Sequence, residues 1–347
     1  MKRVCILGHF AYGQNAANGQ TIKTKIVTEE LSRRFGEEQI KTIDTCGGIK
    51  TIFKSPFQAL SALKSAKNIV MLPAHNGVRV YGFLLPLFRR KKSNKKLFYV
   101  VIGGWLPELV KKRRRLAAKL KKFDGIYVET GTMKVALEAL GFNNIRVLPN
   151  CKELRVLRED ELVYTNEAAY SLCTFSRINE KKGIEEAVNA VKAINQKYEK
   201  VIYNLDIYGS VDKGQEEWFQ SIRETFPSFV QYKGLVDFNK SVDVLKNYFA
   251  LLFPTRYYTE GVPGTIIDSY ASGVPVLSSK WESFSDVVFP DITGYGYEFD
   301  DFNDFVSKLD FLCQNAGQVN ALKLNCLETA KHYMPQEAMN VLVEDFL

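Results

Sequence analysis

Short apolar runs alternate with longer amphipathic stretches along the first half of the chain. The apolar runs, each typical of a buried strand, lie at residues 4–7, 41–44, 68–72, 97–102, 125–128 and 144–147. After the first run, Ile22, Ile26, Val27 and Leu31 recur at helical spacing and predict a helix over residues 21–35. This alternation of strands and helices favours a parallel, doubly wound α/β sheet.

The same rhythm starts again after residues 150–165, a polar stretch without strong periodicity. Its predicted strands lie at residues 169–175, 203–208, 230–233, 250–253 and 274–277, and its predicted helices at residues 184–197, 215–225 and 240–248. We therefore expect two α/β domains, residues 1–155 and residues 156–334, joined through the polar stretch and followed by a final helix.

Length and composition agree with two ordinary globular domains. The chain has 347 residues, of which 46% are hydrophobic and 25% are charged. No segment offers the roughly 18 consecutive apolar residues that span a bilayer, and the first apolar run is too short for a signal peptide. The six cysteines form no C-x-x-C pair, which favours reduced thiols in the cytoplasm. The three histidines show no metal-ligand spacing, so no metal is expected.

Charge is distributed very unevenly between the two predicted domains. Residues 1–155 contain 30 Lys and Arg against 10 Asp and Glu, a net +20, whereas residues 156–347 contain 17 against 29, a net −12. The first domain is therefore expected to meet a polyanion or an anionic surface.

Two basic clusters, Arg89–Lys96 and Lys111–Lys122, carry much of this positive charge. Leu109, Leu116 and Leu120 recur beneath the second cluster and predict a basic amphipathic helix. Such a helix suits an anionic membrane interface, and the alternative is a solvated basic face. Nucleic acid is disfavoured, because no recognised binding module accompanies the charge.

The segment from Phe253 to Ser279 places two acidic residues, Glu260 and Asp268, around a Gly/Pro turn and the start of an apolar helix. In such strand–loop–helix units, ligands bind beyond the carboxyl end of the strand. The free N–H groups of Gly264 and Thr265 would meet an anion there, most simply a phosphate. The alternative is a loop without a ligand and an Asp that only complements the helix dipole.

A second candidate site lies at residues 175–184, where a predicted strand ends in a basic loop before a helix. Arg177 and Lys182 are placed to neutralise a diphosphate, since Arg offers a fork of donors and Lys a movable point charge. A solvated turn that carries a few charges is the alternative.

These two segments resemble those of the family-4 glycosyltransferases, which have the GT-B fold. Glu260 and Asp268, separated by seven residues, resemble the family's Glu-x7-Glu signature with Asp268 in place of the second Glu. Residues 176–183 resemble the family's Gly-Arg-Leu-x-x-x-Lys-Gly segment, with Ser176 in place of the first Gly. The resemblance is strong over residues 170–295 and weak over the first domain.

The resemblance implies a GT-B fold, in which two Rossmann-like, doubly wound domains face a central cleft. It also implies that the final helix, residues 335–347, packs back on the first domain, and that residues 156–334 form the nucleotide-sugar donor domain. Arg177 and Lys182 would grip the nucleotide diphosphate, Glu260 would orient the donor sugar, and Asp268 would hold the ribose.

Further residues take roles from the same resemblance. His75 would lie at the sugar-binding end of the cleft, and the turns at Gly209 and Gly234 would border the base and ribose. The alternative for each glycine taken alone is that it only permits a tight turn. The backbone of Gly19 and Gln20, at the start of the first helix, could approach the diphosphate from the first domain, even though the spacing there is not G-x-G-x-x-G.

By this resemblance the protein is a retaining, metal-independent hexosyltransferase without a cofactor. It would move a sugar from a UDP- or GDP-linked donor to a lipid-linked saccharide acceptor in capsule, O-antigen or exopolysaccharide biosynthesis. The two basic clusters further predict that the protein binds peripherally to the inner face of a bacterial membrane. The alternatives are a GT-B nucleotide-sugar epimerase and a non-catalytic protein that binds an anionic membrane.

Overall fold

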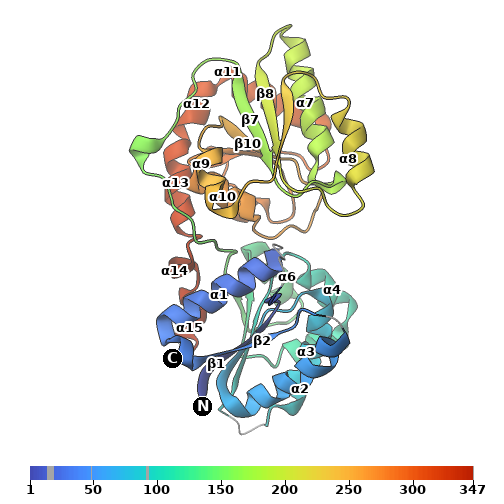
Figure 1. Cartoon of the computed structure of the whole chain (residues 1–347), viewed down its shortest axis with the longest axis vertical. Coiled ribbons are helices and arrows are strands. Elements are labelled where there is room, and N and C mark those ends of the chain that lie inside the picture. Colours follow the sequence, from blue (N-terminus) through green and yellow to red (C-terminus); the bar gives the residue numbers. More distant parts are fainter. Residues whose placement is uncertain (14–18, 48, 91–93, 347) are drawn as a thin grey trace. The chain divides into compact units, whose positions relative to one another are not determined.

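The computed structural model describes residues 1–13, 19–47, 49–90 and 94–346. The chain divides into two compact units, the first made of Met1–Glu153 and Tyr333–Leu347 and the second of Leu154–His332. Each unit is built around one six-stranded parallel sheet (Figure 1).

The sheet of the first unit has the strand order β2-β1-β3-β4-β5-β6. Its strands are β1 (Lys2–Gly8), β2 (Ile40–Asp44), β3 (Ala66–Met71), β4 (Lys96–Val100), β5 (Gly125–Val128) and β6 (Ile145–Val147). Its helices are α1 (Gly19–Phe35), α2 (Ile49–Ser65), α3 (His75–Phe88), α4 (Leu106–Lys112), α5 (Arg114–Leu120) and α6 (Gly131–Ala139). Strand order runs outward in opposite directions from β1 and β3, and open parallel sheets bind ligands at such a switch point.

Both faces of this first sheet are covered, because successive side chains of a strand point to opposite faces. Cys5 and Leu7 of β1 join a core with residues of α2, α3 and α5. Val4 and Ile6 join a core with α1 and with Met339, Leu342 and Phe346 of the C-terminal segment, which holds the helices α14 (Pro335–Ala338) and α15 (Asn340–Glu344). Figure 1 shows α1, α14 and α15 on one side of the sheet and α2, α3 and α4 on the other.

The sheet of the second unit has the strand order β12-β11-β10-β7-β8-β9. Its strands are β7 (Tyr170–Phe175), β8 (Tyr203–Tyr208), β9 (Val230–Gly234), β10 (Ala250–Phe253), β11 (Val276–Ser279) and β12 (Gly294–Tyr297). Its helices are α7 (Ile184–Lys197), α8 (Glu216–Arg223), α9 (Ser241–Leu245), α10 (Gly264–Ala271), α11 (Phe302–Gln314), α12 (Ala316–Ala321) and α13 (Lys323–Lys331). The switch point of this sheet lies between β7 and β10.

Several elements differ from their predicted form. β12 was not predicted, because its sequence alternates Gly and Tyr and glycine is a poor strand former. A glycine is needed there, since a Cβ at Gly294 would lie 2.0 Å from the Val276 carbonyl oxygen of the neighbouring strand. The final helix is divided into the short helices α14 and α15, and the segment predicted as a strand at residues 274–277 forms its strand at Val276–Ser279.

The predicted basic amphipathic helix is also wrong as a single element. Arg113 has a non-helical backbone, with φ −129° and ψ 70°, and separates α4 from α5. Five successive cations, Lys111–Arg115, repel one another along a continuous helix. Two short helices still allow both Leu109 and Leu116 to pack into the same core.

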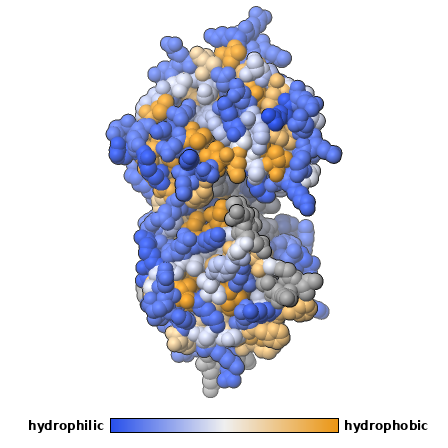
Figure 2. Space-filling model, viewed as in Figure 1, coloured by the Kyte–Doolittle hydropathy of each residue, from blue (hydrophilic) through white to orange (hydrophobic). Residues whose placement is uncertain are grey.

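The molecular surface drawn in Figure 2 is mostly hydrophilic, with small separate apolar areas on each unit. Over the residues that the structure describes, no helix combines the length and the apolar character needed to cross a bilayer.

Candidate functional site

The loops that follow β7 and β10 meet at the switch point of the second sheet. The β7 loop carries Arg177 and Lys182, and the β10 loop carries Glu260. A 2.8 Å backbone hydrogen bond from Arg256 N to Lys181 O ties the loops together. Gly183 allows this close approach, because its φ is +70° and a Cβ there would lie 1.9 Å from the Pro254 carbonyl oxygen.

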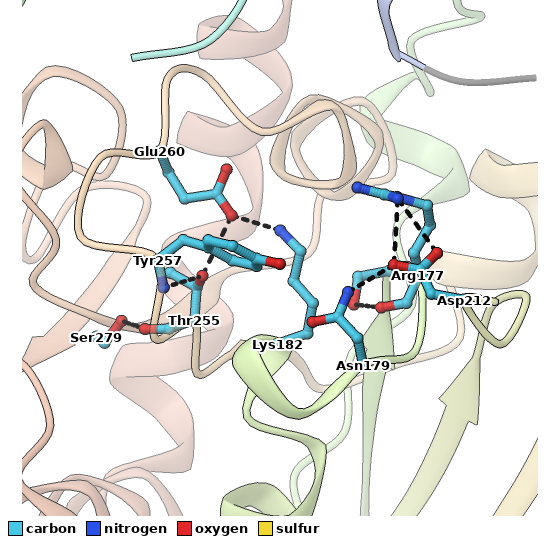
Figure 3. A network of polar contacts seen from close by, with 9 residues as sticks. Arg177, Asn179, Lys182, Asp212, Thr255, Tyr257, Glu260 and Ser279 are labelled. Atoms are coloured by element: carbon cyan, nitrogen blue, oxygen red, sulfur yellow. Dashed lines mark hydrogen bonds and ion pairs between the residues drawn. The ribbon is translucent and has the colours of Figure 1, made fainter. Parts of the chain in front are cut away.

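Lys182 and Glu260 form an ion pair between these two loops (Figure 3). Both side chains are largely buried, with exposed fractions of 12% and 19%. The Lys182 ammonium nitrogen also lies 5.1 Å from the ring centroid of Tyr257 and 5.4 Å from that of Phe253. Aromatic faces attract a cation that has lost water, so these rings help to hold the ammonium in place.

Thr255 orients the Glu260 carboxylate and was not predicted from the sequence. Its buried hydroxyl donates a 3.2 Å hydrogen bond to Glu260 Oε1 and accepts one of 3.2 Å from Tyr257 N. Its carbonyl oxygen accepts a 2.6 Å hydrogen bond from Ser279 Oγ, at the end of the neighbouring strand β11. The carboxylate is therefore anchored to the sheet through a short hydrogen-bonded chain.

Arg177 lies beside Asp212 and is 61% exposed. Its guanidinium donates to both Asp212 carboxylate oxygens at 3.2 Å, and Asn179 Nδ2 donates to the same carboxylate at 2.8 Å. Asp212 was not predicted as a site residue. The clue was its position shortly after β8, a strand that neighbours β7 and ends beside the Arg177 loop.

Tyr257 connects the two parts of this cluster electrostatically. Burial raises the pKa of its phenol, the positive charge of Arg177 acts in the opposite direction, and the carboxylates of Glu260 and Asp212 add to the increase. The phenol therefore stays protonated at neutral pH and can donate a hydrogen bond. In Figure 3 the Arg177 and Lys182 side chains extend to the same side of the ribbon, with the Tyr257 ring beside Lys182.

The predicted anion site at the start of α10 has a distinct geometry. α10 begins at Gly264 after Pro263, with no side-chain cap on its first N–H groups. Thr265 Oγ1 is buried and has no hydrogen-bond partner among the described residues. A buried hydroxyl without a partner is costly, so this helix start has unused hydrogen-bonding capacity.

Asp268 is a buried residue of α10. Only 2% of its surface is exposed, and its Oδ1 accepts a 2.8 Å hydrogen bond from Ser241 Oγ of α9. The carboxylate is therefore engaged inside the second unit. Its predicted role toward a ribose stays a prediction.

The two predicted turns require glycine for different physical reasons. Gly209 has φ +138°, and a Cβ there would lie 1.8 Å from the Ser176 carbonyl oxygen, so this turn packs directly against the Arg177 loop. Its N–H donates a 2.9 Å hydrogen bond to Gly234 O. Gly234 has φ +77° with open space around it, so its backbone conformation alone requires glycine.

The candidate residues of the first unit lie near the carboxyl ends of its strands. Gly19 and Gln20 are the first two residues of α1, while the neighbouring Asn18 of the same predicted loop lies outside the described residues. His75 is the first residue of α3, after β3, and its ring meets Trp105 edge-on with centroids 5.2 Å apart. A 3.1 Å contact joins His75 Nδ1 to the Arg79 guanidinium.

Part of the first basic cluster supports the fold instead of facing outward. Lys91, Lys92 and Ser93 lie outside the described residues. Arg89 pairs with Asp124, and Lys96 Nζ donates a 2.7 Å hydrogen bond to Asp345 O in the C-terminal segment.

The second unit matches a known protein family in sequence. Residues 169–315 match the family model described as Glycosyl transferases group 1. This range contains Arg177, Lys182, Glu260 and Asp268. No curated protein matches the chain in sequence.

Solved structures resemble the whole chain. A structure of Anabaena HepE in complex with UDP and glucose has a TM-score of 0.74 and 11% identity over 99% of each chain. The sucrose-phosphate synthase of Thermosynechococcus elongatus has a TM-score of 0.76 and 15% identity over 99% of this chain and 98% of that one. The chain has the GT-B fold. The lipopolysaccharide outer core galactosyltransferase WaaB, in its apo form, adds a GT-B neighbour with a TM-score of 0.69 and 16% identity over 99% of each chain.

The GT-B architecture confirms the predicted fold class of two Rossmann-like parallel sheets. Within the second unit the structure brings Arg177, Lys182 and Glu260 into one cluster and packs the Gly209 turn beside it. Asp268 is engaged with Ser241, and Gly19, Gln20 and His75 belong to the first unit.

Proposed function

We propose that this GT-B protein is a glycosyltransferase that uses a nucleotide sugar. The observation that carries the proposal is the placement of two cations, Arg177 and Lys182, with the carboxylate of Glu260 at the switch point between β7 and β10. The match of residues 169–315 to the Glycosyl transferases group 1 model supports it, because that range contains all three residues.

The cations suit the charge that develops during sugar transfer. The bond between the anomeric carbon and the leaving phosphate oxygen breaks, and the oxygen keeps the electron pair. Arg177, Lys182 and the N–H groups of Gly264 and Thr265 would stabilise this negative charge, which is electrostatic catalysis without a protein nucleophile. Four such donors can do this without a bound metal. The acceptor hydroxyl oxygen forms the new bond to the anomeric carbon, with retention of anomeric configuration, and its proton passes to the leaving phosphate oxygen.

The ion pairs seen in the structure define what a diphosphate must displace. Lys182 would move from Glu260 toward the phosphates, and Arg177 would loosen its contact with Asp212. The freed Glu260 carboxylate could then accept hydrogen bonds from the donor sugar. Asp268 would act on the ribose, and His75 near the reacting end of the sugar.

The finer assignment concerns the partners of the reaction. We propose a UDP- or GDP-linked hexose as donor and a lipid-linked saccharide as acceptor, in capsule, O-antigen or exopolysaccharide biosynthesis at the cytoplasmic face of a membrane. The large positive charge of residues 1–155 supports contact with an anionic lipid surface. Vesicle binding should therefore weaken strongly as salt rises, and binding that is unchanged at high salt would rule out this electrostatic contact.

Thermal unfolding with UDP, GDP and ADP tests the donor site first. A ligand that binds only the folded state raises the melting temperature, so one of these nucleotides should do so. The absence of a shift with all three would overturn the proposal. A donor screen that follows nucleotide release, with and without a lipid-diphosphate saccharide, then separates transfer from epimerisation, which turns over without an acceptor.

A further inference from the structure

A pocket of about 510 Å³ opens in the first unit near the carboxyl ends of β3 and β4. Its lining includes His75 and Arg79 of α3, Trp105 after β4, Glu108 and Lys112 of α4, and Arg113 at the break between α4 and α5. The break between α4 and α5 therefore contributes to the lining of this pocket, because Arg113, the residue with the non-helical backbone, is one of the lining residues.

The positive charges of this pocket are poorly compensated. Neither Arg79 nor Arg113 has a carboxylate partner among the residues that the structure describes. Glu108 is the one carboxylate of the lining, and it lies 3.8 Å from Lys112 and 3.8 Å from Lys111. Arg79 Nη2 contacts the neutral His75 ring at 3.1 Å. Guanidinium groups without a carboxylate partner at a concave site favour a bound anion.

One side of the cationic centre, which Arg79, Lys112 and Arg113 form, is aromatic. The Trp105 indole N–H donates a 2.7 Å hydrogen bond to Ile102 O, which fixes the ring, and His75 packs against it. Burial lowers the pKa of His75, and the charges of Arg79 and Arg113 lower it further. The imidazole is therefore neutral at pH 7. A rigid apolar ring with a neutral hydrogen-bonding group beside it suits a sugar.

The cationic centre continues into a neighbouring pocket of about 550 Å³. This pocket shares Arg79, Lys112 and Arg113 with the first, and its lining adds the cations Lys111, Arg114 and Arg115 beside the apolar Phe83 and Leu116. The surface thus changes from aromatic to strongly cationic across two adjoining pockets.

From this order of surfaces we infer that the first unit binds an acceptor in which a sugar is joined to a phosphate. The phosphate lies at Arg79, Lys112 and Arg113, and the sugar lies against Trp105. The inference rests on the proposed transferase function and names the chemical class of its acceptor. The phosphate can belong to a lipid or to a soluble glycosyl phosphate.

Binding of small probes tests this site directly. The probes are glucose 1-phosphate, glucose, octyl phosphate and octyl glucoside, each added in the presence of UDP so that the proposed donor site is occupied. The imidazole NMR signals report binding locally, because the chain has only three histidines and a His75→Gln variant identifies the signal of interest. Both phosphates should shift the His75 signal and raise its pKa, and the two neutral probes should bind at least tenfold more weakly.

Two variants and one control connect the effect to the pocket. Arg79→Gln and Arg113→Gln should each weaken both phosphate probes by about tenfold or more, as expected for lost charge-assisted hydrogen bonds. Lys25→Gln removes the same charge from an exposed position of α1 and should change nothing. Tighter binding of octyl phosphate than of glucose 1-phosphate indicates a lipid acceptor, and the reverse order indicates a soluble one.

The test separates this inference from the proposed function. Unchanged phosphate binding in both arginine variants overturns the phosphate site, even where UDP still raises the melting temperature. A missing UDP shift overturns the transferase proposal, whereas probe binding that depends on Arg79 and Arg113 would still support the anion pocket.

Discussion

The Lys182 ammonium and the Glu260 carboxylate form an ion pair although the two residues are 78 positions apart in the sequence. The contact exists because β7 and β10 are neighbours in the sheet, so the loops after them meet. It places side by side the cation proposed to meet a phosphate and the carboxylate proposed to orient a sugar.

Glu260→Gln should lower the rate of sugar transfer by at least about 100-fold, because the charged hydrogen-bond acceptor that orients the donor sugar is lost. UDP binding should persist, since Lys182 is released from its partner. Donor turnover and UDP-dependent melting measure the two effects. Glu298→Gln, which alters an exposed carboxylate of the same unit, serves as control. Full activity of Glu260→Gln would refute the role of this carboxylate.

Lys182→Gln should weaken UDP binding by about tenfold or more, because a largely buried ammonium can no longer meet the diphosphate. Calorimetric titration with UDP measures the change. Lys181→Gln is the matched control, since its exposed side chain precedes Lys182 and makes only an aromatic contact with Tyr257 among the interactions described. Equal effects of the two substitutions would contradict a specific role for Lys182.

Gly183→Ala should lower the unfolding free energy by roughly 1–3 kcal/mol or more, because a Cβ would collide with the Pro254 carbonyl oxygen at 1.9 Å. Gly214→Ala is an informative comparison. Gly214 also has a positive φ, +83°, but nothing lies within 4 Å of an added Cβ, so only backbone strain of about 1 kcal/mol is expected. Similar losses for both variants in thermal unfolding would show that the loops can separate freely.

Lys323 of α13 should make stability depend on pH in the alkaline range. Burial lowers the pKa of this amine from 10.5 to about 8. Between these two values the unfolded chain holds a proton that the folded chain has released, so the unfolding free energy should rise with pH. The cost of the buried charge is present below pH 8. At pH 7, Lys323→Met should therefore raise the unfolding free energy by at most about 3 kcal/mol. The loss of the 3.2 Å hydrogen bond from Lys323 Nζ to Tyr248 O reduces this gain.

Urea unfolding between pH 7 and pH 10 measures the Lys323 effect. Lys331→Met changes an exposed amine of the same helix and should leave the pH dependence unaltered. If Lys323→Met keeps the rise in stability seen in the original protein, another group is responsible.

Asp268 and Ser241 should be energetically coupled, because a 2.8 Å hydrogen bond joins them in the interior. Asp268→Ala should cost about 1–3 kcal/mol of unfolding free energy. In a double-mutant cycle with Ser241→Ala, the coupling energy should be about 1 kcal/mol. Additive single effects would show that the hydrogen bond from Ser241 contributes little to holding this carboxylate.

Much of the second unit could be predicted from the sequence because its signals are local. The apolar run before Thr255 and the helical spacing of Ile266, Ile267 and Tyr270 gave a strand and a helix at nearly their observed bounds. The same holds for the strand before Arg177 and the helix after Gly183. Chemically distinctive residues at strand ends were visible too, which is why the Arg177, Lys182 and Glu260 cluster was anticipated.

Other features depend on residues that are distant in the sequence. Asp212 meets Arg177 only through the strand order, and the Thr255 carbonyl oxygen meets Ser279 Oγ for the same reason, whereas the contact of Thr255 with Glu260 is made within one loop. β12 exists because Gly294 fits closely against Val276 of β11, whereas the composition of β12 argues against a strand. The break at Arg113 leaves no sign in the apolar pattern, because Leu109 and Leu116 keep the seven-residue spacing of a continuous helix.

The sequence by itself determined the α/β alternation, the uneven charge and the residue types at the ends of the strands, because each depends on neighbouring positions and on side-chain chemistry. Only the tertiary structure decided which strand ends are adjacent, and hence that Lys182 pairs with Glu260, that Asp268 is buried against Ser241, and that Arg79 and Arg113 line one pocket. The physical reason is that strand order and core packing are set by contacts between distant segments, whose combined burial outweighs local preferences.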